Sequence, residues 1–280
     1  NFVYLNEDVL YDVQSVNASL SAPRTTINVA GMTASANVPN GFLQGSLSIE
    51  RSAVTLSGND PFTKPEFYAN GFSGIWEYIN AAGEENYFAI TSGYLASYTF
   101  NASVGSVPTI SNEITAFGNK IGQIGVSSFS FSDGKTGDSD FTDAYAFPRK
   151  MTLTFPDGAT DAVQSFNLSF NIDRQMKNRL GQMKAIPETF VSYPIEVTLS
   201  IDLLVDEYSA PAVETLLCRP TQDISLELLE GCEGTPIRNF NFTSGRLISV
   251  TSQEAVTDRN TATLSYVKHI NDVNDIGTIL

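Results

Sequence analysis

The sequence has little of what a disulfide scaffold, a zinc site or a histidine-based catalytic centre requires. Among 280 residues there are two cysteines and one histidine. Cys218 and Cys232 are too few for a disulfide framework. They also lack the second cysteine pair or the nearby histidines that would complete a zinc site. We therefore expect one isolated disulfide or two free thiols, and no metal or other cofactor.

Positive charge is also scarce. Lysine and arginine number 16 against 31 aspartates and glutamates, so the formal net charge is −15. A protein that wraps tightly around nucleic acid needs a surface of lysine and arginine, so this composition argues against tight binding. It does not argue against DNA that passes close by without binding. No apolar run approaches the ~20 residues of a membrane helix, and no basic-then-apolar signal segment begins the sequence. We expect no membrane partner.

The few reactive side chains stand outside any catalytic motif. His269, the single histidine, lies beside Lys268, and no nucleophile-elbow motif accompanies it. The pair Glu84 and Glu85 lies in a turn-like, polar stretch and is expected to form a solvated loop. The stretch "DSDFTD" (138–143) lacks the central glycine and the closing glutamate of a calcium loop. The sequence thus assigns no catalytic, cofactor-binding or metal-ligating residue.

What the sequence does contain is the composition and periodicity of β-strands. Hydrophobic residues make up 42% and charged residues 17%, which indicates a globular chain rather than a disordered one. Threonine, serine, valine, isoleucine and phenylalanine are plentiful. In "VQSFNLSFNI" (163–172) and "IEVTLSIDLLV" (195–205), apolar and polar residues alternate as they do in half-buried strands. We expect a mainly β, antiparallel protein.

The sequence also repeats itself. The phrase "TSGYLAS" (91–97) returns as "TSGRLIS" (243–249). Without gaps, "VQSVNASLSAPRTTINVAG" (13–31) aligns on "VQSFNLSFNIDRQMKNRLG" (163–181). Because order and spacing are kept between these matches, we interpret the chain as a tandem duplication.

The duplication predicts two domains joined by a linker. The first repeat covers residues 1–125, a linker rich in serine, aspartate and glycine covers 126–150, and the second repeat covers 151–280. Each repeat is predicted to be a small antiparallel β-sandwich or barrel with one flanking helix. The helix is expected at residues 64–80 in the first repeat and at 209–218 in the second.

The repeated phrase supplies marks of register between the two repeats. These marks are Thr91, Gly93 and Leu95 in the first repeat, and Thr243, Gly245 and Leu247 in the second. Each phrase is expected to lie in an equivalent strand, with its leucine pointing into the core. Its glycine is expected at a bulge or at a close approach of two backbones.

One long segment in each repeat joins two strong strands, at residues 23–41 and 173–189. A simple hairpin needs two to five connecting residues, and loops of this length are uncommon unless they have a function. We call these segments the arms. The second arm carries Arg174, Lys177, Arg179 and Lys184, and the first carries Arg24, Asn28 and Gly31. A basic arm on an acidic body indicates contact with another molecule of the same chain.

Two stretches of the sequence carry short motifs that belong together. In "LASYTFNASVGSVPTISNEITAFG" (95–118), a strand ending in Val104-Gly105 is followed by the phrase Val107-Pro108-Thr109. Residues 167–202 have the pattern of a strand, a basic arm with Leu-Gly, and a strand that opens near a Tyr-Pro pair. In both stretches the chain resembles the tail tube proteins of tailed bacteriophages, and together they make the resemblance span most of the chain.

The resemblance implies a structural protein with tail-tube-like domains. Such domains join edge to edge into a β-barrel ring, and an arm reaches into the next ring. The stacked rings form a hollow tube whose lumen holds the tape-measure protein and then the genomic DNA, without sequence specificity. Six single-domain subunits usually form a ring, so a duplicated chain implies a homotrimer with pseudo-sixfold symmetry.

The resemblance also implies where the chain acts and which residues make contacts. The arm residues named above would lie between rings, and tail-tip and terminator proteins would be further partners. Assembly would take place in the host cytoplasm, and the product would be part of the virion tail. Three alternatives stay open: a hub or distal tail ring protein, a secreted two-domain β-sandwich that binds carbohydrate or acts as an adhesin, and an acidic glycosidase.

Overall fold

The chain forms an antiparallel β structure, seen in a computed structural model. The structure describes residues 2–5, 8–10, 13–21, 24–27, 36–39, 44–53, 60–117, 121–124, 149–156, 158–177, 188–204, 221–229, 236–253 and 261–280. Among them, no helix is long and apolar enough to cross a membrane.

The described part of the first half consists of strands, with two very short helices between β6 and β7. They are β1 (Phe2–Leu5), β2 (Asp8–Leu10), β3 (Val13–Ser21), β4 (Arg24–Ile27), β5 (Ala36–Pro39), β6 (Gln44–Ser52), β7 (Phe72–Ile79), β8 (Glu85–Ser103), β9 (Thr109–Phe117) and β10 (Ile121–Ile124). The 3₁₀ helix η1 (Pro61–Thr63) and the helix α1 (Pro65–Tyr68) precede β7.

The second half ends in a 3₁₀ helix. Its strands are β11 (Lys150–Phe155), β12 (Gly158–Thr160), β13 (Val163–Asn171), β14 (Arg174–Lys177), β15 (Glu188–Val191), β16 (Ile195–Leu204), β17 (Gln222–Leu229), β18 (Pro236–Gln253) and β19 (Thr261–Ile270). The helix η4 (Val273–Thr278) follows.

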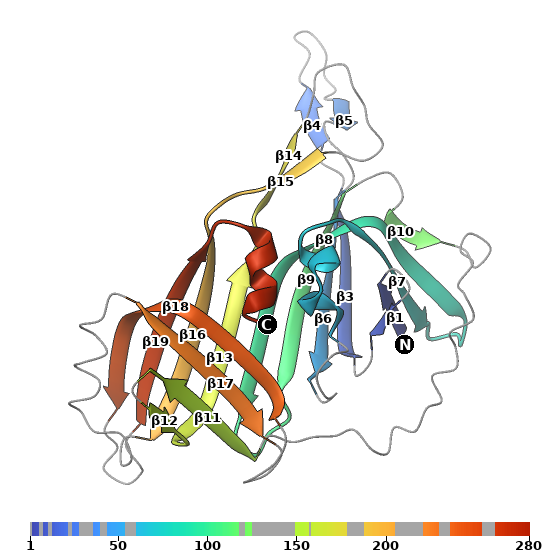
Figure 1. Cartoon of the computed structure of the whole chain (residues 1–280). Coiled ribbons are helices and arrows are strands. Elements are labelled where there is room, and N and C mark those ends of the chain that lie inside the picture. The colour runs from blue at the N-terminus through green and yellow to red at the C-terminus, as the bar shows by residue number, and fades with distance from the viewer. Residues whose placement is uncertain are drawn as a thin grey trace.

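Two units with one strand order make up the body (Figure 1). The first unit runs β2-β1-β7-β8-β9-β6-β3, and the second runs β12-β11-β17-β18-β19-β16-β13. The long strands β8 and β18 change partners along their length. The first part of β8 pairs with β7 and its last part with β9, as β18 pairs first with β17 and then with β19. The expected mainly β, antiparallel fold is confirmed. The boundaries 1–125, 126–150 and 151–280 stay a prediction.

The two units also share their irregularities. The register shifts between Val13 and Ser15 in β3, and between Val163 and Ser165 in β13. Where β7 meets β8 a shift lies between Phe72 and Gly74, and where β17 meets β18 one lies between Gln222 and Ile224. Where β8 meets β9 a shift lies between Leu95 and Ser97, and where β18 meets β19 one lies between Leu247 and Ser249. A bulge adds one residue to a strand and increases its local twist. The same three positions of each unit therefore bend in the same way.

The repeated Thr-Ser-Gly phrase marks the place where the long strand changes partners. Gly93 pairs with Phe72 of β7 and also with Ala116 of β9. A Cβ on Gly93 would approach the Ile90 side chain to 2.7 Å, and one on Gly245 would meet the Phe242 ring. Both glycines lie next to a register shift, so the expected bulge is confirmed, while the close contacts are made with side chains and not with a second backbone. Thr91 and Thr243 lie just before them, in β8 and β18.

The core is one contiguous apolar cluster that runs through both units. In β13, Phe166, Leu168 and Phe170 are all at most 3% exposed, while the residues between them are polar. Leu95 is fully buried and Leu247 is 7% exposed, so both leucines of the repeated phrase point into the core as expected.

The helix expected at residues 64–80 is wrong over most of its length. The helix α1 covers only Pro65–Tyr68, and β7 (Phe72–Ile79) pairs with β1 and β8. Aromatic and β-branched residues suit a pleated surface, and glycine weakens a helix interior. A Cβ at Gly74 would approach the Ile90 and Leu5 side chains to 3.1 Å, so this position of the strand is tightly packed. The helix expected at 209–218 lies outside the described residues.

The arms begin and end as two-stranded ribbons. In the first arm β4 pairs with β5, with Arg24 opposite Pro39, and in the second β14 pairs with β15, with Arg174 opposite Val191. Both ribbons extend away from the body at the same end of the molecule (Figure 1). The chain thus uses each long connection to build a projecting ribbon.

We expect Gly245→Ala to lower the free energy of unfolding by about 1–3 kcal/mol, because the added methyl group meets a buried ring. Urea unfolding followed by circular dichroism measures the change. Ser249→Ala, at an exposed position of the same strand, is the control and should shift the value by less than about 0.5 kcal/mol. An unchanged midpoint for Gly245→Ala would show that the Phe242 ring has room to move.

Candidate assembly interface

The two units are joined by strand pairing. β13 of the second unit pairs with the last part of β8 in the first unit, from Ser165 opposite Ser103 to Asn171 opposite Ser97. Backbone bonds continue past both ends, since the Val104 amide donates to Gln164 and the Ile172 amide donates to Ala96. We call this contact the seam. One sheet therefore passes from the first unit into the second.

Stacked aromatic rings cover the buried face of the seam. Tyr98 stacks on Phe170 with ring centres 5.3 Å apart, and Phe100 stacks on Phe166 at 5.5 Å. Phe240 meets both Phe100 and Phe166 edge-on, at 4.8 and 5.5 Å. Aromatic pairs in these geometries add to the stabilisation that comes from burying their area. The buried face of the seam is therefore a closely packed, dry contact.

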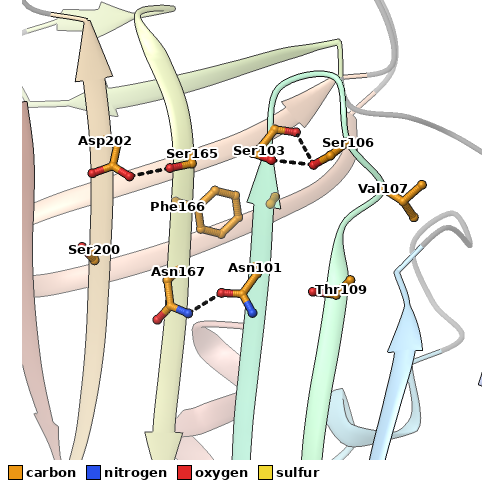
Figure 2. A pocket seen from close by; sticks show the side chains of 11 residues that line it. Asn101, Ser103, Ser106, Val107, Thr109, Ser165, Phe166, Asn167, Ser200 and Asp202 are labelled. Atoms are coloured by element: carbon orange, nitrogen blue, oxygen red, sulfur yellow. Dashed lines mark hydrogen bonds between the residues drawn. The ribbon is translucent and has the colours of Figure 1, made fainter. Parts of the chain in front are cut away.

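The opposite face of the seam is polar and forms a shallow depression of about 420 Å³ (Figure 2). Across the seam, the Asn167 amide donates to the Asn101 side-chain carbonyl. The Ser165 hydroxyl donates to the Asp202 carboxylate at 2.5 Å. Hydroxyls and amides can hold water or polar groups here, and Asp202 is the carboxylate among the lining residues. Nothing in this lining resembles a nucleophile with its base.

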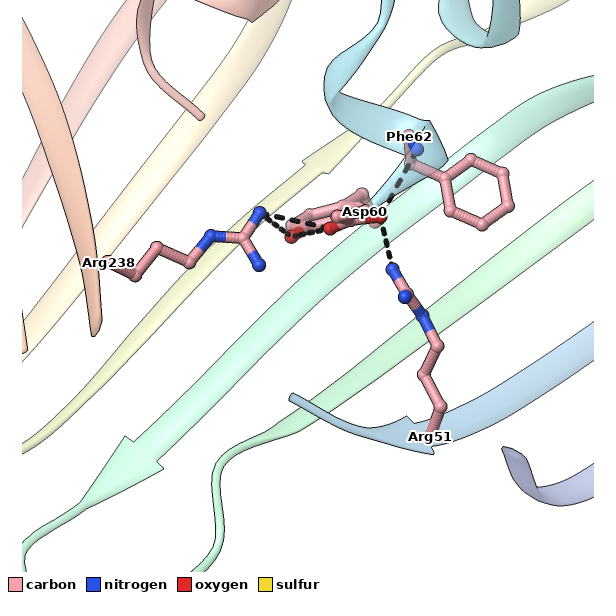
Figure 3. A network of polar contacts seen from close by, with 5 residues as sticks. Arg51, Asp60, Phe62 and Arg238 are labelled. Carbon is pink, nitrogen blue, oxygen red and sulfur yellow. Dashed lines mark hydrogen bonds and ion pairs between the residues drawn. The ribbon is translucent and has the colours of Figure 1, made fainter. Parts of the chain in front are cut away.

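A buried carboxylate ties the two units together beneath the seam (Figure 3). Asp60 accepts from the Arg51 guanidinium of β6 and, at 2.9 Å, from Arg238 of β18 in the second unit. It also accepts from the Tyr98 hydroxyl and from the Phe62 amide, each at 3.1 Å. We call this group the clamp. Removing the Asp60 charge would leave two guanidiniums in the interior without a counter-charge, whereas removing either arginine would leave one buried ion pair.

The clamp shifts the acidity of its members. Burial by itself would raise the pKa of the Asp60 carboxyl, but the guanidiniums of Arg51 and Arg238 outweigh it and lower the pKa from 3.8 to about 2. Burial raises the pKa of the Tyr98 hydroxyl well above its ordinary value. Asp60 is therefore ionised and Tyr98 is neutral throughout the physiological range.

The structure describes only some of the arm residues that were expected to make contacts between rings. Arg24 and Lys177 lie on β4 and β14, while Asn28, Gly31, Arg179 and Lys184 lie outside the described residues. The role of all these residues between rings stays a prediction.

Arg174 is engaged within its own chain. Its guanidinium lies 4.9 Å from the centre of the Tyr94 ring and donates to the Tyr68 carbonyl, and burial lowers its pKa. This arginine therefore anchors the base of the second arm to the first unit. His269 is exposed on β19.

Eight strands form one continuous row that includes the seam: β3-β6-β9-β8-β13-β16-β19-β18. We call this row the wall. The side chains on the face turned away from the core are mostly serine, threonine and asparagine. The carboxylates on that face are Glu50, Glu113, Glu196 and Asp202. Among the described residues, the positively charged side chain on that face is Arg246. This face is polar and, on balance, acidic.

Sequence reasoning missed the clamp. Arg238 lies 178 positions after Asp60, and Arg51, nine positions before Asp60, forms no recognisable motif with it. An aspartate before a proline, as in Asp60-Pro61, is at most the sign of a helix start, and here Asp60 does cap η1. Nothing in the spacing could have indicated that two arginines converge on it.

Comparison with known proteins leaves the family open. No family model and no curated protein matches the chain. Among solved structures, Hcp1 from Flavobacterium johnsoniae is similar with a TM-score of 0.29 and 12% identity, covering 43% of this chain and 94% of that one. The baseplate of the anti-feeding prophage gives a TM-score of 0.30 and 11% identity, over 43% of this chain and 91% of that one. Likenesses this weak assign no family.

We expect Asp60→Asn to lower the free energy of unfolding at pH 7 by about 3–5 kcal/mol, because two buried guanidiniums lose their counter-charge. Urea unfolding of the wild type and the variant measures the difference. Asp161→Asn is the matched control, since that half-exposed carboxylate pairs with Lys150 at 2.7 Å and surface pairs contribute about 0–1 kcal/mol.

The wild type and Asp60→Asn also test the lowered pKa of Asp60. Its pKa is lower in the folded state, so its charge stabilises the fold above pH 4 and that contribution is lost as the pH falls towards 2. The difference between wild type and Asp60→Asn should therefore shrink by roughly 2 kcal/mol between pH 5 and pH 2. A difference that is constant with pH would contradict the clamp.

Proposed function

We propose that the chain is a structural subunit that self-assembles into stacked rings, which form the hollow tube of a phage-type tail. The observation that carries this proposal is the seam. Two similar units already join side by side by strand pairing, so that a single wall of eight strands runs through both. Repetition of that junction between molecules extends the wall into a closed ring.

The physics of sheet edges favours closure. An unpaired strand edge presents free amides and carbonyls and promotes association, and a closed barrel removes every such edge. In this proposal three chains supply six units, so that the ring is a homotrimer with pseudo-sixfold symmetry. The duplication of the chain and the number three rest on the sequence repeat and on the resemblance to tail tube proteins.

The surface of the wall suits a conduit for DNA. A duplex carries one negative charge per about 1.7 Å of its axis, so that a basic lining would hold it in place. The exposed face of the wall carries four carboxylates and Arg246 among its described residues, and the whole chain has a net charge of −15. We infer that this face lines the lumen, which would hold the tape-measure protein and then the genomic DNA.

The arms supply a way to stack rings. Both ribbons extend from one end of the body, and the second is rich in basic residues while the body is acidic (Figure 1). Charge complementarity of this kind brings a projecting ribbon onto the next ring. The subunit would then act in the virion tail after assembly in the host cytoplasm, with tail-tip and terminator proteins at its two ends. A hub or distal tail ring protein is the related alternative.

Negative-stain microscopy and mass photometry of the purified chain test the proposal. Rings and hollow stacks, with a particle mass three times that of the chain, are the expected result. Particles that stay monomeric at every concentration and bind glycans would instead support a carbohydrate-binding protein.

We expect neutralisation of the second arm to abolish stacking but not ring formation. The variant Lys177→Gln, Arg179→Gln and Lys184→Gln keeps Arg174, because Arg174 anchors the arm to its own body. The fraction of stacked rings should fall on the order of tenfold, since the attraction between arm and body is lost. Counting rings and tubes in micrographs measures it.

Single substitutions provide the matched comparison. Lys184→Gln removes one charge from the arm, and Arg149→Gln removes one exposed charge from the body. Only the arm variant should shorten the tubes. Equal tube lengths for all variants would show that the basic arm has no part in stacking.

A further inference from the structure

We propose that β3 of one molecule pairs with the last part of β18, residues 246–253, of the next molecule, in the register that β13 adopts on β8 inside the chain. The partner is a second copy of this chain. The inference rests on the proposed self-assembly and names the strands, the register and the side chains that close the ring.

The two strands lie at the ends of the wall. β3 pairs with β6 on one edge, and residues 246–253 pair with β19 on one edge. The other edge of each pairs with no strand among the described residues. Their counterparts are β13 and the last part of β8, which use those same edges for each other in the seam.

The shared bulges fix how the strands correspond. Val13 and Ser15 flank the bulge of β3 as Val163 and Ser165 flank that of β13, so numbers differ by 150. Bulges after Leu95 and Leu247 relate β8 to β18, with a difference of 152. We apply these two differences to the residue pairs of the seam, subtracting 150 on the β13 side and adding 152 on the β8 side. The result places Asn17, Ser19 and Ser21 opposite Gln253, Thr251 and Ser249.

The transferred register reproduces the polar chemistry of the seam. Inside the chain Ser169 lies opposite Thr99, and between molecules Ser19 lies opposite Thr251, which is the same pair of residue types.

An amide pair is kept as well. Inside the chain the Asn167 amide donates to Asn101, and between molecules Asn17 lies opposite Gln253. Because a register slip by one residue moves every side chain to the other face, this agreement across several positions is specific.

The apolar side of the two edges is less buried than that of the seam: Val16, Ala18 and Val250 are half-buried against the core, and Leu20 and Ile248 are exposed. Leu20 is 49% exposed, whereas its counterpart Phe170 is 3% exposed and stacks on Tyr98. In the transferred register Leu20 lies opposite Val250. Ile248, at the beginning of the free part of β18, is 57% exposed. A second molecule would cover these side chains, as β13 and β8 cover theirs.

Both edges lack the charges that normally protect an edge strand. Proteins place lysine, proline or inward-pointing charges on exposed edges to prevent unwanted pairing. β3 has no charged residue over its nine residues, and residues 246–253 carry one, Arg246. Open edges with so few charges and with matching side chains suit docking.

The closing contact is weaker than the seam. Val16, Ala18 and Leu20 stand where the seam has Phe166, Leu168 and Phe170, and Val250 stands where it has Tyr98. Smaller apolar side chains bury less area and therefore contribute less to association. Each molecule thus holds its two units permanently, while closure between molecules is reversible and depends on concentration.

Cysteine cross-linking tests the register. The wild-type cysteines are first replaced, with Cys218→Ser and Cys232→Ser, and Ser19→Cys is combined with Thr251→Cys. The seam counterparts of these positions form a non-hydrogen-bonded pair, since backbone bonds join Ile172 to Ala96 and Val104 to Gln164. Such pairs bring Cα atoms to about 4.5 Å, within reach of a disulfide.

Two controls accompany the cross-link. Thr99→Cys with Ser169→Cys has the same geometry inside one chain and should give an oxidised monomer. Ser19→Cys with Ser249→Cys is displaced by two residues and should cross-link on the order of tenfold less. Non-reducing electrophoresis and microscopy of the same samples measure the covalent species and the rings.

Each outcome separates the two proposals. Rings whose molecules are joined covalently through residues 19 and 251 support both. Rings without that cross-link overturn the register and leave the ring proposal standing. Covalent pairs without rings support the edge pairing and overturn the tube. Neither rings nor cross-links overturn both.

A charged residue placed on the free edge of β3 gives a second, independent test of the proposed pairing. Leu20→Lys should reduce ring formation on the order of tenfold at equal concentration, because a lysine on an edge strand opposes pairing. Ile79→Lys, at a hydrophobic position of β7 that is 63% exposed and outside the wall, is the control and should assemble normally. Circular dichroism confirms that both variants fold. Normal assembly of folded Leu20→Lys would overturn the proposed contact.

Discussion

The pairing of β13 with β8 is the contact on which the rest of the structure depends. It joins the two units, continues their sheets into one wall, and places the rings of Tyr98, Phe100 and Phe166 in a common core. Strand pairing satisfies backbone groups along both edges, and the stacked rings exclude water from one side. A molecule held together in this way already contains the kind of junction that the proposed assembly would repeat.

The clamp explains why the junction is rigid. Asp60 draws an arginine from each unit to one buried point, and the Arg238 guanidinium also lies 5.1 Å from the centre of the Phe100 ring. A buried ion group is strongly destabilised when one partner is removed, so the two units hold one relative position. The two ends of the wall therefore keep a defined angle to each other, which the proposed ring would need.

Much of the fold could be predicted from the sequence because its signals are local. Alternation in residues 163–172 identified a strand, and the repeated phrase at Gly93 and Gly245 located equivalent bulges. The helix expected at 64–80 failed, since aromatic residues near two glycines fit either a broken helix or a strand until the neighbours β1 and β8 decide. The clamp left no local signal at all.

The sequence by itself determined the strand periodicity, the internal repeat and the acidic charge, because each depends on residue order and composition alone. Only the tertiary structure decided that β13 pairs with β8, that Arg238 reaches Asp60, and that Arg174 turns back onto Tyr94. These contacts join residues as many as 178 positions apart. Which edges meet depends on the competition among all strands for partners, and that competition is settled only when the whole core is packed.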